Sequence, residues 1–242
     1  MRKTFTGLLI LLLMPLTLYG EQLKRSYRII VIDSYHAEYD WSHRTNEGLL
    51  SALKDGALIS KIEKEQMLKE DRVQGQHIEY LRIRMDTKRQ KSKSYISGKV
   101  QEISGVIDNY KPDIIFLGDD NAVENIGYAF LDEIYPIVFW GVNGKPDRYD
   151  FFESLDIPGH NITGIYQSMY QDDSAKLLKK LLPNIETMAV IGDNSKTSRA
   201  RVAQIRALEK ADKWPVKIKE YVLNDNYEQW KRKVENLSEE VD

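Results

Sequence analysis

Three short segments place polar and aromatic side chains directly after apolar runs. They are Ser34-Tyr35-His36, Asp119-Asp120-Asn121 and Gly141-Val142-Asn143. Paired carboxylates suit an amine or hydroxyl groups of a small molecule, and aromatic rings suit its flat or apolar part. These residue types predict the binding of a small polar solute such as an amino acid or a sugar.

Each of these residues also has a plainer interpretation. Either side chain of Asp120-Asn121 can cap the helix that follows it, as such residues commonly do. Gly141 can mark a turn only, and His36 can hold its own loop through a backbone hydrogen bond. Trp41 and Trp140 suit packing better than a platform for a ligand. The sequence leaves both interpretations open.

Signatures of catalysis and of cofactor binding are missing. The sequence has no G-x-S-x-G, no phosphate-binding loop, no dinucleotide fingerprint and no H-E-x-x-H spacing among its four histidines. Gly192-Asp193-Asn194 stands where some esterases carry Gly-Asp-Ser, but it lacks the nucleophile. Asp33, His36, Asp40 and His43 have the spacing of no recognised metal site. We therefore predict that the protein is not an enzyme and holds no metal or cofactor.

Cysteine content excludes two kinds of site, whereas a sequon adds little. With no cysteine, disulfides and thiolate metal sites are excluded. Asn161-Ile162-Thr163 matches a glycosylation sequon, which carries little weight without knowledge of the host.

The elements that must position these segments alternate between strand and helix. Apolar runs predict strands at 27–33, 77–85, 114–117 and 137–140, with helical stripes around 49–57, 96–110 and 122–129. The charged stretch 61–76 is interpreted as a solvated helix or loop. Such alternation predicts parallel sheets, in which ligands bind beyond the carboxyl ends of the strands.

The pattern restarts after the Pro- and Gly-bearing link 156–159. Strands are expected near 162, 188 and 216, with a helix over 200–211 and a last apolar stripe that continues to Val241. We predict a first α/β lobe over 21–158 and a partial second lobe over 159–242. Because the second lobe has few strands, its last helix and exposed sheet edge are expected to be mobile or prone to associate.

The first twenty residues have the pattern of a secretory signal peptide. Arg2 and Lys3 precede an apolar stretch over 8–18, and Gly20 provides a small residue near the predicted cleavage site. As a helix, that stretch rises only about 16 Å, roughly half of a hydrocarbon core. The mature chain is expected in the periplasm with a net charge of −4, which argues against a nucleic-acid partner.

A series of short motifs resembles one known group of proteins in order. It includes Met85-Asp86-Thr87-Lys88-Arg89, Asp119-Asp120-Asn121-Ala122 and 135–143, and it runs over roughly residues 27–222. The sequence is similar to the substrate-binding proteins of ABC transporters and to the related extracellular sensor domains of bacterial histidine kinases. The resemblance implies a periplasmic-binding-protein-like fold (type I), with two doubly wound lobes that close on a ligand.

Carried over by position, the resemblance makes the three polar segments the ligand-binding loops. It implies a solute-binding protein that serves a membrane permease. The alternatives are a ligand-sensing module for a signalling partner such as a sensor kinase and, with less support, an exported hydrolase on a similar scaffold.

Overall fold

The computed structural model describes residues 26–143, 149, 153–154, 157, 159–167, 170–237 and 239–242. The predicted signal peptide lies outside these residues. The chain divides into two compact units, Met1–Tyr166 and Gln167–Asp242, and each is described by itself.

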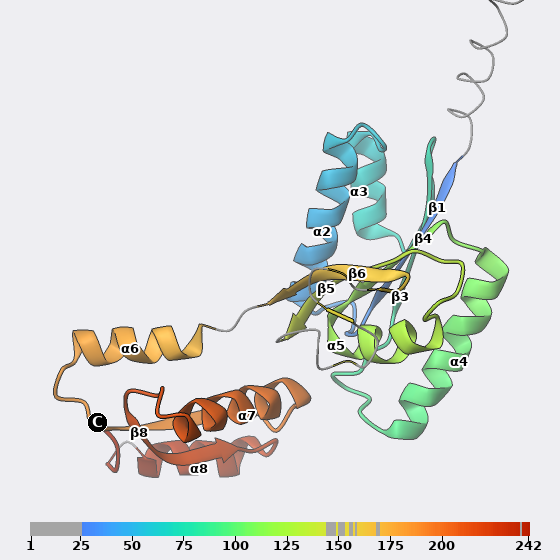
Figure 1. Ribbon diagram of the computed structural model, residues 1–242. Helices are drawn as coiled ribbons and strands as arrows, with labels where there is room; N and C mark the ends of the chain where they lie inside the picture. Colours follow the sequence, from blue (N-terminus) through green and yellow to red (C-terminus); the bar gives the residue numbers. More distant parts are fainter. Residues whose placement is uncertain are drawn as a thin grey trace, which may run out of the picture. The chain divides into compact units, whose positions relative to one another are not determined.

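The first unit is built on a six-stranded sheet (Figure 1). Its strand order is β2-β3-β1-β4-β5-β6. The pairs β1/β3, β1/β4 and β4/β5 are parallel, and β2 is antiparallel to β3. The strands are β1 (Tyr27–Asp33), β2 (Arg72–Gln74), β3 (Ile78–Arg84), β4 (Ile114–Gly118), β5 (Ile137–Asn143) and β6 (Ile162–Gln167).

Helices cover both faces of this sheet, with α2 and α3 on one side and α4 and α5 on the other (Figure 1). Strand β1 alternates accordingly: Ile30 and Ile32 join the core cluster that contains α4, while Ile29 and Val31 join the cluster that contains α2. The nearly continuous apolar run of β1 therefore reflects burial on both faces. The helices are α2 (Asp40–Asp55), α3 (Lys61–Lys69), α4 (Lys93–Tyr110), α5 (Asp119–Ala122) and the π-helix η2 (Val123–Gly127).

Local sequence signals explain where two of these helices begin and end. Ser60 and Glu63 form a capping box at the start of α3, with the Ser60 Oγ accepting from the Glu63 N–H over 3.2 Å. Ser92 caps α4, with its Oγ accepting from the Tyr95 N–H over 3.2 Å. Helix α4 ends at Lys111, whose backbone is left-handed (φ 52°), directly before Pro112.

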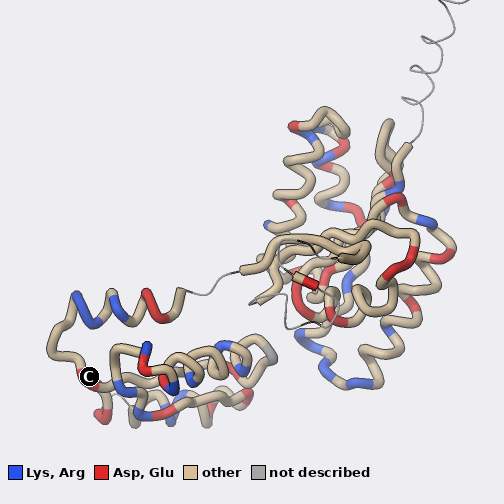
Figure 2. Tube along the Cα trace, viewed as in Figure 1, with Lys and Arg blue, Asp and Glu red and all other residues tan. Residues whose placement is uncertain are grey.

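The second unit contains a two-stranded parallel sheet with three helices. These elements are α6 (Gln171–Leu181), β7 (Thr187–Gly192), α7 (Lys196–Lys210), β8 (Lys217–Leu223) and α8 (Tyr227–Leu237). Helix α6 has acidic residues in its first turn and basic residues in its last (Figure 2), an arrangement that complements the helix dipole.

Four features differ from the prediction. Strand β6 pairs within the first sheet, so the division between the units falls at 166/167, whereas the predicted lobe boundary was 158/159. The charged stretch 61–76 contains helix α3, as the helical interpretation predicted, but it also contains the short strand β2, in which only Val73 is buried. The segment 141–143 is the end of β5, not a loop, and α8 ends at Leu237, before Val241.

Candidate functional site

The carboxyl edge of the first sheet brings the first two predicted segments together. Strands β1 and β4 are neighbours, and the chain moves outward from them to β3 on one side and to β5 on the other, so the strand order reverses here. Ser34 follows β1, and its Oγ donates to the Gly118 carbonyl over 2.7 Å while accepting from the Ala122 N–H over 2.8 Å. This fully buried hydroxyl therefore fastens one segment to the other.

Asp120 connects the third segment to the second. Its carboxylate accepts from the Asn143 side chain over 2.7 Å, from the Asn143 N–H over 3.3 Å and from the Tyr149 hydroxyl over 3.1 Å. The side chain of Asp120 is buried, and its oxygens are occupied by these donors. The predicted segments thus meet at one edge, and Asp120 serves to hold them there.

Asp119 differs from its neighbour. Its backbone is left-handed (φ 69°), a conformation uncommon for residues other than glycine and often found at functional sites. One carboxyl oxygen, Oδ1, accepts from the Trp41 indole over 2.9 Å. The other, Oδ2, is buried and has no hydrogen-bond partner among the described residues.

The environment of Asp119 changes its ionisation. Burial raises the pKa of Asp119 to about 8, the Trp41 hydrogen bond opposes this shift, and the charges of Asp33 and Asp120 add to it. Near pH 7 the carboxyl group is therefore mostly protonated. A neutral carboxylic acid can donate a hydrogen bond as well as accept one.

Neither aspartate caps a helix. Helix α5 starts after Gly118, and no side chain makes a capping hydrogen bond there. The Asn121 amide instead donates to the Thr87 hydroxyl over 2.9 Å, which ties the second segment to the loop after β3. The capping interpretation is therefore not what the structure shows.

A buried ion pair lies beneath this edge. Arg82 Nε donates to Asp33 Oδ2 over 2.6 Å, and Arg82 Nη2 donates to the Ser42 carbonyl over 2.9 Å. Burial raises the pKa of Asp33, while the Arg82 charge and hydrogen bond oppose the shift. Through Ser42, Arg82 fixes the first turn of α2 and with it the neighbouring Trp41.

At two positions the backbone passes so close to a carboxyl group that only glycine fits. A Cβ on Gly118 would lie 2.9 Å from Asp33 Oδ1, and a Cβ on Gly141 would lie 2.7 Å from Asp119 Oδ1. Gly141 also has a positive φ of 74°. These glycines let the backbone pass directly against the two buried carboxyl groups.

The loop after β3 contributes residues that site prediction from the sequence missed. Lys88 Nζ lies 5.0 Å from the centre of the Tyr35 ring and 5.3 Å from that of Tyr39. The two rings meet edge to face at 4.6 Å, and His36 Nδ1 lies 3.6 Å from Asp86 Oδ1. A sequence signal existed, since this loop also follows a strand of the same parallel sheet.

The remaining residues considered in the sequence analysis, those of a possible metal site and of the sequon, make structural contacts instead. Among the described residues, no group of three His, Asp or Glu side chains could hold a metal ion. Two of the four residues weighed as metal ligands form ion pairs: Asp33 pairs with Arg82, and Asp40 pairs with Arg44. The Asn161 amide of the sequon donates to three backbone carbonyls, those of Phe130, Glu133 and Tyr135.

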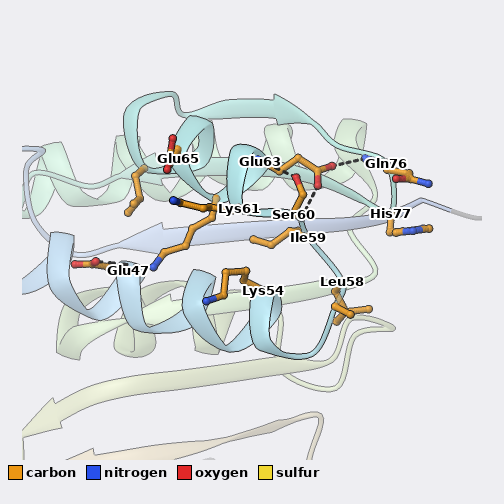
Figure 3. Close-up of a pocket in the computed structure, with 13 residues that line it drawn as sticks. Glu47, Lys54, Leu58, Ile59, Ser60, Lys61, Glu63, Glu65, Gln76 and His77 are labelled. Carbon is orange, nitrogen blue, oxygen red and sulfur yellow. Dashed lines mark hydrogen bonds and ion pairs between the residues drawn. The ribbon is translucent and has the colours of Figure 1, made fainter.

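A groove of about 840 Å³ lies between α2 and α3, at the amino edge of the sheet (Figure 3). Its polar groups largely satisfy one another. Glu63 accepts from the Ser60 and Gln76 N–H groups, each over 2.6 Å, and Lys64 lies 3.9 Å from Glu47. This groove is remote from the three predicted segments, which gather at the opposite edge.

No helix within the described ranges is long and apolar enough to cross a membrane.

Comparison with known proteins supports the fold. A family model described as "ABC transporter substrate binding protein" matches residues 79–242. No curated protein sequence matches the chain. The family match confirms the resemblance that the sequence motifs indicated.

Solved structures with the same fold are distant in sequence. A ligand-free, open substrate-binding protein from Clostridium difficile is 17% identical, with a TM-score of 0.54. The match covers 89% of this chain and 63% of that protein's chain. An ABC domain from Streptococcus pneumoniae in complex with L-Trp is 16% identical with a TM-score of 0.57, covering 90% and 63%. A Rhodopseudomonas palustris solute-binding protein in complex with 3,4-dihydroxybenzoic acid is 12% identical with a TM-score of 0.52, covering 88% and 52%.

These matches confirm the predicted α/β fold of the periplasmic-binding-protein type. The chain spans less than two thirds of the length of each of these proteins.

Proposed function

The chain belongs to the family of ABC transporter substrate binding proteins, and from this premise we propose that it captures a small solute outside the cytoplasm for a membrane permease. One observation carries the proposal. The three polar segments predicted from the sequence are bonded to one another at the carboxyl edge where the strand order reverses. This is the position at which open parallel sheets bind ligands.

The segments divide into residues that support the edge and residues that can face a solute. Ser34, Asp120 and Asn143 use their side chains to bind the segments together. Asp119 has a carboxyl oxygen without a partner in the described part of the chain, and Trp41 is 40% exposed. We propose Asp119 as the main polar contact, with Tyr35, His36, Asn121, Gly141 and Val142 around it.

The solute class is suggested by the relatives. One structural relative is in complex with L-Trp and another with 3,4-dihydroxybenzoic acid. Both are small molecules with an aromatic ring and a carboxylate. We propose a solute of comparable size, bound at the carboxyl edge of the first sheet.

A ligand-sensing module for a signalling partner is the second candidate. The motifs at 85–89 and 119–122 resemble sensor domains as well as transport proteins. Both functions use the same solute site. Co-purification from the host with a permease would support transport, whereas co-purification with a sensor kinase would support sensing.

Export is part of the proposal. The basic and apolar pattern of residues 1–20 supports a signal peptide that is removed near Gly20. Mass spectrometry of the protein from the periplasmic fraction should find a mature terminus near Glu21. An intact Met1 in that fraction would contradict cleavage.

The binding test is a thermal-shift screen of residues 21–242 against a solute library that includes L-Trp and 3,4-dihydroxybenzoate. A solute at a hundred times its Kd stabilises by about 2.7 kcal/mol, which is readily seen as a shift in Tm. The same solute should bind Asp119→Ala roughly ten- to a hundredfold more weakly. Asp120→Ala should chiefly lower Tm. If no solute stabilises the parent, the proposed function is wrong; if Asp119→Ala binds as tightly as the parent, the site is misplaced.

A further inference from the structure

The loop after β3 contains several charged side chains, and all but one of those described below lie beside a side chain of opposite charge. Arg89 Nε donates to Asp86 Oδ1 over 2.8 Å, and Arg89 Nη1 lies 3.6 Å from Glu38. His36 also lies beside Asp86. The ammonium of Lys88, in contrast, has no carboxylate or carbonyl partner among the described residues.

Two aromatic rings hold Lys88 in place without neutralising it. Its Nζ lies near the faces of both Tyr35 and Tyr39, at 5.0 and 5.3 Å from the ring centres. Such cation–π contacts are worth about 0.5–1 kcal/mol at exposed sites, and they leave the positive charge available to an anion. Tyr35 belongs to the first predicted segment and is buried, so Lys88 is held at the carboxyl edge.

We infer that Lys88 is a specificity-determining residue, which binds a carboxylate or an equivalent anionic group of the solute. This inference rests on the proposed function and names the chemistry that its site selects. It departs from the sequence-based expectation that the paired aspartates bind an amine or hydroxyl groups.

The charges at this edge support an anionic solute. Asp120 is engaged by Asn143 and Tyr149. Burial keeps the pKa of Asp119 near 8, and the charge of Lys88 acts to lower it. Near neutral pH the Lys88 ammonium and the neutral Asp119 acid can both donate hydrogen bonds to a carboxylate.

The test compares pairs of probes in which a carboxylate is replaced by a neutral amide of nearly the same shape. L-Trp is paired with L-tryptophanamide, and 3,4-dihydroxybenzoate with its amide, together with the amide of any other carboxylate that stabilises the parent. Affinities are measured by calorimetry for the parent, for Lys88→Met and for Lys61→Met. Lys61 is an exposed lysine of α3 that lines the groove at the amino edge, so its replacement removes the same charge far from the site.

We expect the parent to prefer each acid over its amide, and Lys88→Met to bind the acids roughly ten- to a hundredfold more weakly. The preference for acid over amide should shrink by the same factor, which a merely structural role of Lys88 would not produce. Lys61→Met should behave as the parent, and Lys88→Arg should retain most of the preference because it keeps the charge.

The outcomes separate this inference from the proposed function. If the solutes that stabilise the parent carry no carboxylate or other anionic group, or if Lys88→Met keeps the parent's preference for acids, the inference is overturned and the proposed function stands. If no solute stabilises the parent, the proposed function fails and the inference fails with it.

Discussion

Trp41 and Asp119 are joined across the carboxyl edge of the first sheet by a hydrogen bond of 2.9 Å from the indole Nε1 to the carboxyl Oδ1. The bond links the first turn of α2 to the residue that follows β4. Because the Trp41 ring is partly exposed, its fluorescence should report changes in the ionisation of Asp119 and in the occupancy of the edge. Four measurements follow from this arrangement and from the elements around it.

The first concerns stability against pH. Burial raises the pKa of Asp119 from 3.8 to about 8. Above roughly pH 4 the unfolded chain ionises this residue while the folded chain keeps it protonated, so this carboxyl lowers the free energy of unfolding by about 1.4 kcal/mol per pH unit until the pH reaches about 8. Asp119→Asn should lack that slope. Urea unfolding from pH 5 to 9 should show a difference from the parent that grows up to about pH 8 and is then constant. The exposed Glu65→Gln variant is the control, and a difference independent of pH would contradict the assignment.

The second concerns solute affinity against pH. When Asp119 ionises, it loses a hydrogen-bond donor and gains a negative charge. The affinity for a carboxylate probe should therefore fall as the pH rises through about 8, the value to which burial raises the pKa of Asp119. Asp119→Asn should show a flat profile over the same range. A rise in carboxylate affinity above pH 8 in the parent would exclude this role for Asp119.

The third concerns the buried ion pair. Removing Arg82 leaves Asp33 charged or forced to take up a proton in a fully buried position, so Arg82→Met should cost about 3–5 kcal/mol of stability. Arg72→Met provides the matched control, since Arg72 pairs with Glu79 at the surface over 3.3 Å and its loss should cost at most about 1 kcal/mol. Urea unfolding measures both. Equal losses in the free energy of unfolding for the two variants would show that the buried ion pair stabilises the fold no more than the surface pair does.

The fourth concerns the apolar surface of α6. Leu177 and Leu181 of α6, and Leu182 directly after it, are all more than half exposed. The charged side chains at the two ends of α6 favour the helix without any contribution from these leucines. Leu181→Lys should change stability by less than about 0.5 kcal/mol and should reduce any self-association. Sedimentation analysis of the parent and the variant over a range of concentrations measures this. A large loss of stability would mean that Leu181 is packed.

The main elements were predictable because their patterns are strong. Strand β1 occupies the predicted range, since burial on both faces produces a continuous apolar run. Strand β2 was missed because only Val73 of its three residues is buried, within a highly charged stretch. The Pro- and Gly-bearing link was interpreted as a boundary, although the strand that follows it completes the first sheet.

The partners at the candidate site were not predictable in the same way. Asp119 and Asp120 look equivalent in the sequence, and their different roles depend on residues far along the chain. Trp41 is 78 positions from Asp119, and Asn143 is 23 positions from Asp120. The strand–helix alternation predicts which edge they share, but side-chain packing decides which donor reaches which carboxyl group.

The direction of β1 has a practical consequence. The strand begins at Tyr27, whose N–H donates to the His77 carbonyl at the amino edge, and it ends at Asp33 beside the polar segments. Seven residues of strand separate these points by roughly 20 Å. A biotin or a fluorophore coupled ahead of Tyr27 therefore leaves the sheet on the side opposite to the solute-facing residues. Immobilised on a sensor chip through that end, the protein should present this edge to the flowing solution.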